Sequence, residues 1–241
     1  MNRDVSESIY QSDFVRGLFD EMSRTYGVVN VVSSFGFCAL WRRQCVDQID
    51  LQDASRVVDL MSGMGELNRL ISKRAGPTVS ITGYDISTEM CKRARENVDG
   101  RPIDATTIEA DVLEFDFEAN SADVVVSCFG LKTFSEQQQT VLAEKVFRML
   151  KPGGKFAFLE ISIPAFSLLR LPYEFYLNYI IPVLGKLFLG NPDNYRLLGV
   201  YTRKFDSCKN VGDIFCDAGL DTSLSSFFFG CATGVWGTRP E

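Results

Sequence analysis

Short apolar runs alternate with stretches of helical periodicity through the middle of the chain. Strands are predicted over 57–61, 79–84, 105–109, 122–127 and 154–161, and helices over 65–75, 87–98 and 135–150. Strands that alternate with helices favour right-handed crossovers and a mostly parallel sheet with helices on both faces. Because ligands of such sheets bind at the carboxyl edge, polar residues at strand ends are the first candidates for a site.

Two further patterns flank this core. Apolar residues at helical spacing from Asp13 to Ile49 predict short helices that are broken at Gly27 and Gly36. The β-rich runs 223–229 and 231–238 predict an antiparallel hairpin added to the sheet. The pattern therefore predicts one domain, with a helical cap (1–50), a core (51–162), a helical segment (163–210) and a C-terminal helix with a hairpin (211–241).

The stretch 163–190 is apolar but interrupted. It contains Pro164, Pro172 and Pro182 as well as Arg170, Glu174 and Lys186, which fit a membrane-spanning helix poorly. A helical lid over an apolar substrate is the favoured interpretation, and a peripheral membrane contact stays open as an alternative.

Composition narrows the function classes. The net charge of −6 over 241 residues and the lack of a long basic run argue against a nucleic-acid partner. The chain has no histidine, which removes the commonest general base and metal ligand, so no metal site is predicted. Seven cysteines without C-x-x-C spacing and a polar N-terminus predict free thiols and a cytoplasmic location.

A glycine turn follows the first strand, and an acid ends the second. Gly63 and Gly65 allow a tight turn and close approach of a ligand to the backbone, although any α/β protein can carry such a turn. Asp85, about twenty residues later, is placed to accept hydrogen bonds from ribose hydroxyls. Together they predict a nucleoside site. A nicotinamide-dependent oxidoreductase is disfavoured because Asn68 stands where G-x-G-x-x-G has its third glycine.

The order of short motifs resembles one family over nearly the whole chain, from about Phe14 to Trp236. The motifs are Tyr26, Asn30, Ser34-Phe35-Gly36, Leu40-Trp41-Arg42, Asp59-Leu60, Gly63-x-Gly65, Asp85, Ala110-Asp111, Ser127-x-Phe129-Gly130-Leu131, Leu150-Lys151-Pro152-Gly153-Gly154, Leu159-Glu160 and Asp193-x-Tyr195-Arg196-x-Leu198. The chain resembles the class I S-adenosylmethionine-dependent methyltransferases, and more narrowly the ubiquinone/menaquinone biosynthesis C-methyltransferases of the UbiE type. The resemblance implies a Rossmann-like fold, with a mostly parallel seven-stranded sheet and a C-terminal antiparallel hairpin.

It also implies the cofactor S-adenosylmethionine, with S-adenosylhomocysteine as product. The implied cofactor residues are Asp59, Met61, Ser62, Gly63, Gly65, Asp85, Ile86, Asp111, Val112, Ser127 and Phe129. Asp59 and the two glycines would surround the methionine part, Asp85 would hold the ribose, and Asp111 would accept from the adenine amino group. A solvated loop acid is the alternative for Asp111.

Some positions depart from the family. Met61 and Met64 stand at positions of the glycine turn where small residues are usual. They could contact the cofactor directly or pack in the core or against a helix. On the acceptor side, Cys38 replaces a frequent histidine, and Phe205-Asp206 replaces a segment that often ends in proline.

Catalytic candidates come from the region around the acceptor. Glu160, at the end of its strand, could act as a base, and Arg203 could stabilise a phenolate. Asn30 could orient a hydroxyl, while Tyr195 and Tyr201 come from the segment that would cover the acceptor. Surface pairing or helix capping explains each of these five residues equally well.

The implied partner is an apolar aromatic small molecule. A wall of Phe166, Leu168, Leu171, Tyr173, Phe175, Tyr176 and Tyr179 would suit a flat or prenylated acceptor, although such spacing also suits a core. Carbon methylation of a quinol-like acceptor is the leading hypothesis for the reaction. The alternatives are N- or O-methylation in a secondary-metabolite pathway and a methyltransferase-like domain that no longer transfers methyl; a homodimer also stays open.

Overall fold

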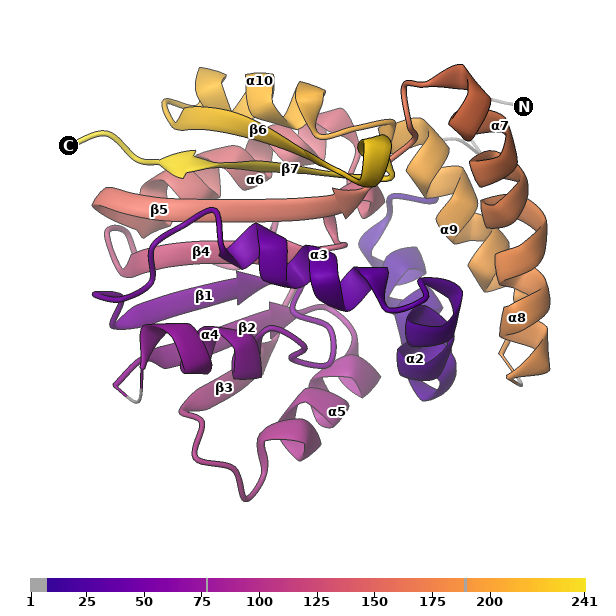
Figure 1. The fold of residues 1–241 in the computed structure, drawn as a ribbon. Coiled ribbons are helices and arrows are strands. Elements are labelled where there is room, and N and C mark those ends of the chain that lie inside the picture. The colour runs from indigo at the N-terminus through magenta and orange to yellow at the C-terminus, as the bar shows by residue number, and fades with distance from the viewer. Residues whose placement is uncertain (1–7, 77, 189) are drawn as a thin grey trace.

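Seven strands form one sheet in the order β3-β2-β1-β4-β5-β7-β6 (Figure 1). The computed structural model describes residues 8–76, 78–188 and 190–241. The strands are β1 (Arg56–Leu60), β2 (Ser80–Asp85), β3 (Ala105–Glu109), β4 (Ala122–Cys128), β5 (Leu150–Ile161), β6 (Asp221–Phe227) and β7 (Ala232–Thr238). The first five strands pair in parallel, whereas β7 runs antiparallel between β5 and β6. The predicted sheet and hairpin are confirmed.

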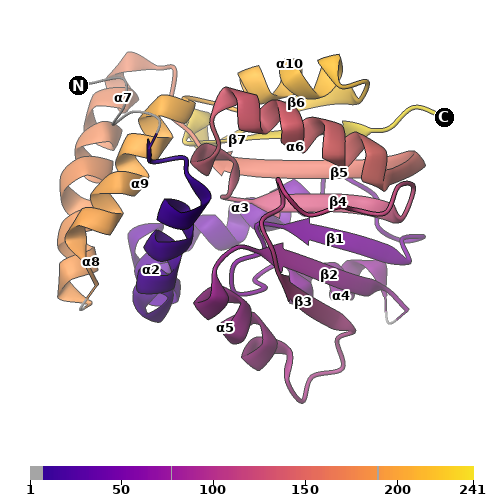
Figure 2. The same cartoon turned by 180° about the vertical axis from the view of Figure 1, so that it is seen from behind.

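Helices cover both faces of the sheet (Figures 1 and 2). The helices of the core are α3 (Phe37–Val46), α4 (Asn68–Ala75), α5 (Thr88–Val98), α6 (Glu136–Met149) and α10 (Lys209–Asp217). In β4, Val124 and Val126 pack with α3 and α4, whereas Val125 packs with α6 and α10. Burial on both faces explains why the strands are nearly continuous apolar runs.

A second helical layer lies beyond the carboxyl edge of the parallel strands (Figure 1). It consists of α2 (Ser12–Ser33), α7 (Ser167–Phe175), η2 (Tyr176–Ile180), α8 (Ile181–Leu187) and α9 (Pro192–Phe205), where η2 is one π-helical turn. Leu18 and Met22 of α2 pack against Tyr195 and Tyr201 of α9. None of the helices in the described part of the chain is long and apolar enough to cross a membrane.

The structure differs from the sequence-based elements at four places, the first of which is β5, which begins at Leu150 rather than at residue 154. Helix α2 runs through Gly27, so the predicted break there is wrong; a Cβ at Gly27 would lie 3.2 Å from Met64 Cε, and glycine permits this close approach. The helix predicted from 65 starts at Asn68, because the turn before it holds left-handed residues. The hairpin turn contains the 3-10 turn η3 (Phe228–Gly230), which is longer than the single glycine predicted to join the runs.

Candidate functional site

The turn after β1 brings the backbone close to the end of β2. Met61, Gly63 and Gly65 all have left-handed backbones, with φ of 52°, 55° and 72°. The left-handed backbone favours glycine at Gly65, where a Cβ would also lie 2.6 Å from Asn68 Nδ2 and would force that side chain to move. The amide of Ser62 donates to the Tyr84 carbonyl at 2.9 Å, which ties the turn to β2.

Asp85 at the end of β2 faces this turn. Its Oδ2 accepts from the Gly63 amide at 2.8 Å, and its Oδ1 accepts from the Ser87 amide at 2.9 Å. Burial raises the pKa of Asp85 to about 6, against the lowering effect of these two backbone donors. Each carboxylate oxygen still has a lone pair, so the group can accept two further hydrogen bonds.

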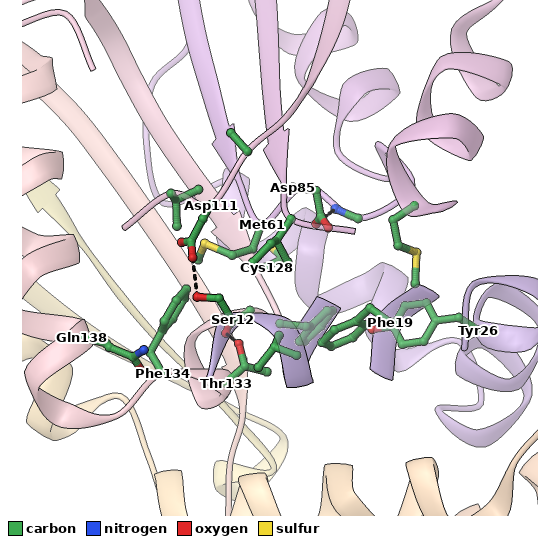
Figure 3. A pocket seen from close by; sticks show the side chains of 18 of the residues that line it. Ser12, Phe19, Tyr26, Met61, Asp85, Asp111, Cys128, Thr133, Phe134 and Gln138 are labelled. Atoms are coloured by element: carbon green, nitrogen blue, oxygen red, sulfur yellow. Dashed lines mark hydrogen bonds between the residues drawn. The ribbon is translucent and has the colours of Figure 1, made fainter. Parts of the chain in front are cut away.

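A pocket of about 760 Å³, open solvent included, lies over the turn and the ends of β2 and β4. Seven of the predicted cofactor residues line it: Met61, Gly63, Asp85, Ile86, Asp111, Val112 and Phe129. In Figure 3, Met61 and Cys128 lie between Asp111 and Asp85. The other side is formed by α2, whose Ser12, Val15, Phe19 and Tyr26 lie on one helical face.

The other four predicted cofactor residues lie behind this lining. Asp59, Ser62 and Ser127 are buried, and Gly65 is half-buried in the turn. Asp59 Oδ2, Ser62 Oγ and Ser127 Oγ have no hydrogen-bond partner among the described residues. Burial, with Glu66 and Asp85 nearby, raises the pKa of Asp59 well above its ordinary value. Buried oxygens that lack partners mark a place where a polar ligand group can bind.

Asp111 follows β3 and is already engaged by the helical layer. Its Oδ1 accepts from the Leu113 amide at 2.9 Å, and its Oδ2 accepts from the Ser12 hydroxyl (Figure 3). A ligand amino group at Asp111 would therefore take the remaining lone pair of Oδ2 or displace the Ser12 hydroxyl.

A half-buried ion pair lines the same pocket; the sequence singled out Arg42 within a motif but not its partner Glu66. Arg42 of α3 donates to Glu66 at 3.0 Å, and its guanidinium lies 5.0 Å from the ring centroid of Phe129. Glu66 Oε2 also accepts from the Met64 amide at 3.1 Å. This pair places one positive and one negative group where a zwitterionic ligand end could bind.

A larger cavity, about 1430 Å³ with open solvent included, adjoins the first pocket. Tyr26 and Phe129 line both, so these two side chains form the shared wall. The lining is mostly apolar and aromatic and comes from α2, α3, α7, η2 and α9. Among the described residues that line it, Lys132 is the one with a charged side chain.

Lys132 and Glu160 form a buried ion pair beside this cavity. Lys132 Nζ donates to Glu160 Oε1 at 2.6 Å and to the Phe129 carbonyl at 2.9 Å. Glu160 also accepts from the amides of Ile161, at 2.7 Å, and Lys132, at 3.0 Å. The carboxylate thus accepts three hydrogen bonds from protein donors, and the ammonium has a third donor left. Sequence reasoning missed Lys132, although it directly follows the Gly130-Leu131 motif.

The five catalytic candidates are dispersed. Glu160 lies at the strand end as expected but lines neither pocket, while Asn30 and Tyr195 line the larger cavity. The Tyr195 hydroxyl pairs with Thr25 Oγ1 at 2.9 Å. Tyr201 is buried and donates to the Ile9 carbonyl, and Arg203 is exposed; neither lines a pocket.

The predicted aromatic wall is split in the same way. Tyr173 and Tyr176 line the cavity. The other five residues point into solvent: Phe166, Leu168, Leu171, Phe175 and Tyr179. The expectation of one continuous substrate wall is therefore wrong, because the two sides of this helix face different surroundings.

The site fits S-adenosylmethionine on its own chemistry. Asp85 can accept hydrogen bonds from a pair of ribose hydroxyls, and Asp111 can accept one from an amino group. Arg42 and Glu66 can pair with the carboxylate and the ammonium of an amino acid end. In the described residues, no group of three histidine, cysteine or acidic side chains is arranged to hold a metal ion.

The fold and this site define an S-adenosylmethionine-dependent methyltransferase of class I. The solved structures that it resembles have this fold. A methyltransferase from Aquifex aeolicus is 18% identical with a TM-score of 0.56, over 82% of this chain and 89% of that one. Human N-acetylserotonin methyltransferase is 18% identical with a TM-score of 0.58, over 93% of this chain and 59% of that one.

Relatives in sequence narrow the class to a family. The demethylmenaquinone methyltransferase of Thermus thermophilus is 30% identical to this chain, over 92% of this chain and 100% of that protein. The ubiquinone/menaquinone biosynthesis C-methyltransferase UbiE of Hydrogenovibrio crunogenus is 30% identical over 86% of this chain and 82% of its own. The model of the ubiE/COQ5 methyltransferase family matches residues 6–239. The chain belongs to this family and is an S-adenosylmethionine-dependent enzyme.

Proposed function

We propose that the protein transfers a methyl group to a ring carbon of an apolar hydroquinone or phenol. The observation that carries this proposal is the apolar cavity, which shares the wall of Tyr26 and Phe129 with the cofactor pocket and has Lys132 as its charged lining residue. One relative is named as a ubiquinone/menaquinone biosynthesis C-methyltransferase and the other as a demethylmenaquinone methyltransferase, which favours an acceptor of the quinol class.

The chemistry needs a nucleophilic ring carbon. S-adenosylmethionine, when bound, would supply an electrophilic methyl group, and the electron pair of the methyl–sulfur bond would pass to sulfur. The acceptor hydroxyl gives up its proton to water, the ring carbon forms the new bond to methyl, the ring proton leaves to water, and the phenolate oxygen regains a proton from water, so that one proton is released for each methyl transferred. A phenolate develops during these steps, and the Lys132 ammonium is the group that would stabilise it. Apolar walls exclude water and align the ring.

The residues take distinct roles in this proposal. The cofactor is held by the predicted residues that line the pocket, Met61, Gly63, Asp85, Ile86, Asp111, Val112 and Phe129, while Asp59, Ser62, Gly65 and Ser127 support them from behind the lining. Glu160 acts as a positioning residue through Lys132, and Asn30 and Tyr195 contact the acceptor from the cavity wall. Tyr201 and Arg203 have no part in it, since both lie away from the two pockets.

Product analysis tests the reaction. The purified protein is incubated with methyl-deuterated S-adenosylmethionine and a reduced naphthoquinol that carries a short prenyl chain and lacks the ring methyl. We expect a product labelled on the ring carbon, identified by mass spectrometry and carbon NMR. A label on oxygen would move the protein to the O-methylation alternative. The absence of labelled product with any phenol or quinol tested would refute the proposal.

Calorimetry tests the cofactor side. S-adenosylhomocysteine should bind the wild type and should lose at least about tenfold in affinity in Asp85→Ala, because two hydrogen bonds to a carboxylate are lost. Asp116→Ala, which removes an exposed acid outside the pocket lining, is the matched control and should bind as the wild type does. Unchanged binding in Asp85→Ala would contradict the assignment.

The remaining expectations about partners stay predictions. The net charge of −6 supports the absence of a nucleic-acid partner. A cytoplasmic location is a further proposal, which cell fractionation measures directly. A homodimer is another, which sedimentation measures directly.

A further inference from the structure

The continuous helical run 167–187 is apolar on two opposite faces. Towards the protein, Leu169, Tyr173 and Leu177 line the larger cavity. Towards solvent, a row of side chains at three- and four-residue spacing is between 57% and 76% exposed: Leu168, Leu171, Phe175 and Tyr179, continued by Val183 and Leu187. A surface helix of a water-soluble domain carries a polar outer face, so this outer stripe calls for a different environment.

Two turns extend the same apolar surface. Phe35 is 80% exposed, and Phe228 and Phe229 are 50% and 77% exposed. All three have left-handed backbones, with φ of 49°, 43° and 57°, a conformation that disfavours a bulky side chain. Phe35 lies 6.4 Å from the Tyr176 ring, centroid to centroid. We name the turn at Phe35, the turn 228–229 and the outer face of 167–187 the apolar rim.

The apolar rim surrounds the entrance of the acceptor cavity. Phe35, Pro172 and Phe228 are exposed and also line the cavity. The rim and the outermost helices α7 and α8 lie at the end of the molecule beyond the carboxyl edge of the sheet (Figure 1). An apolar compound would therefore reach the cavity across apolar surface only.

The rim is also nearly free of charge. Residues 25–41 and 222–238 contain no aspartate, glutamate, lysine or arginine. Within 163–188 the charged residues are Arg170, Glu174 and Lys186, and the first two pair at 2.9 Å. Attraction to anionic lipid requires a cluster of basic residues, so the chemistry here is that of apolar insertion.

We propose that the apolar rim inserts into the interface of a neutral, zwitterionic lipid bilayer, so that the acceptor cavity opens towards the acyl chains. The inference rests on the proposed function, because an apolar acceptor dissolves in that phase. A second copy of the chain seated on the rim would cover the entrance of the cavity. A bilayer leaves the entrance open and delivers the acceptor to it.

Vesicle flotation with the full chain tests this surface. The wild type should float with phosphatidylcholine vesicles equally at low and high salt. Leu168→Asp/Leu171→Asp, which changes two exposed residues outside the cavity lining, should lower the bound fraction by at least about tenfold. Val141→Asp on α6, which adds one carboxylate at an apolar residue that is 41% exposed and lies outside the rim, is the control and should bind as the wild type does.

Several outcomes would overturn the proposal. They are a wild type that stays in the aqueous fraction, binding that needs anionic lipid or vanishes at high salt, and a double variant that floats unchanged. A wild-type dimer that dissociates in Leu168→Asp/Leu171→Asp, without vesicle binding, would assign the rim to a second copy instead. S-adenosylhomocysteine calorimetry shows that each variant is folded.

Activity separates this inference from the function on which it rests. With a water-soluble short-chain quinol, the double variant should match the wild type, whereas with a long-chain quinol in vesicles its rate should fall about tenfold. Methylation of the soluble quinol without vesicle binding would refute only the proposed membrane insertion of the apolar rim. Vesicle binding without methylation of either quinol would refute the proposed function but not the membrane insertion.

Discussion

Replacing Lys132 by methionine tests the electrostatic role of the buried pair. The change keeps the bulk of an unbranched side chain and removes the ammonium, which donates to Glu160 at 2.6 Å and to the Phe129 carbonyl at 2.9 Å. Glu160, which is fully buried, keeps the two backbone donors of residues 132 and 161 but loses its countercharge. An uncompensated buried charge is the expected result.

The magnitude of the effect on stability follows from that burial. Removing one partner of a buried ion pair costs about 3–5 kcal/mol of unfolding free energy. For a chain of 241 residues, this corresponds to a fall in Tm of roughly 6–20 °C. The activity should fall separately, because loss of one group that stabilises developing negative charge lowers kcat by about 10²-fold.

A second variant distinguishes the two effects. Lys132→Met/Glu160→Gln removes both charges, so its Tm should return to within a few degrees of the wild type, since neutral replacement of a buried pair is often tolerated. Its kcat for C-methylation should stay about 10²-fold low, with little change in KM. Differential scanning calorimetry and steady-state kinetics measure the two quantities. If the double variant regained kcat together with Tm, Lys132 would have a structural role only.

Three further predictions concern the cofactor side. Since burial raises the pKa of Asp85 to about 6, and hydroxyl donors require the ionised carboxylate, the Kd of S-adenosylhomocysteine should rise about tenfold between pH 7 and pH 5; calorimetry on Asp85→Asn should show this dependence abolished. Ser12→Ala frees an oxygen of Asp111 and should tighten S-adenosylhomocysteine binding about fivefold, whereas weaker binding would mean that Ser12 assists the ligand. Gly130→Ala would place a Cβ 2.5 Å from Met61 Cβ and should lower stability by about 1–3 kcal/mol in urea unfolding; Met61→Gly, but not Met61→Ala, should rescue it, and rescue by both would contradict the clash.

The core of the fold could be predicted because its signals are local. Each strand is an apolar run that ends at a glycine, an acid or a polar turn, and the predicted strands from 57 to 127 agree with β1 to β4 to within about one residue. Ser87 was expected to start a helix, and its hydroxyl accepts from the Met90 amide at 3.1 Å. Such features depend on neighbours in sequence, so a single chain reveals them.

The failures depend on contacts between distant segments. Gly27 resembles a helix breaker in the sequence, but it is the point where Met64 of the glycine turn approaches α2. Lys132, in the turn after β4, resembles an ordinary surface lysine in the sequence, and only the structure shows Glu160 of β5 beside it. Likewise, spacing alone could not show that Tyr173 faces a cavity while Leu171 faces solvent, because a helix with apolar residues on both sides has no preferred inner face.

The two methionines of the glycine turn show how one departure from the family pattern requires another. Met61 takes a left-handed backbone at the place of a usual glycine, and its side chain packs where Gly130 leaves room; the contact would be impossible with any larger residue at 130. Met64 extends towards α2, where Gly27 leaves room in the same way. Each methionine is therefore accommodated by a glycine on a facing element. Asp85, Gly63 and Asp111 still line an open pocket beside Met61, which is the arrangement that a working methyltransferase needs and that a domain with a filled cofactor site would lack.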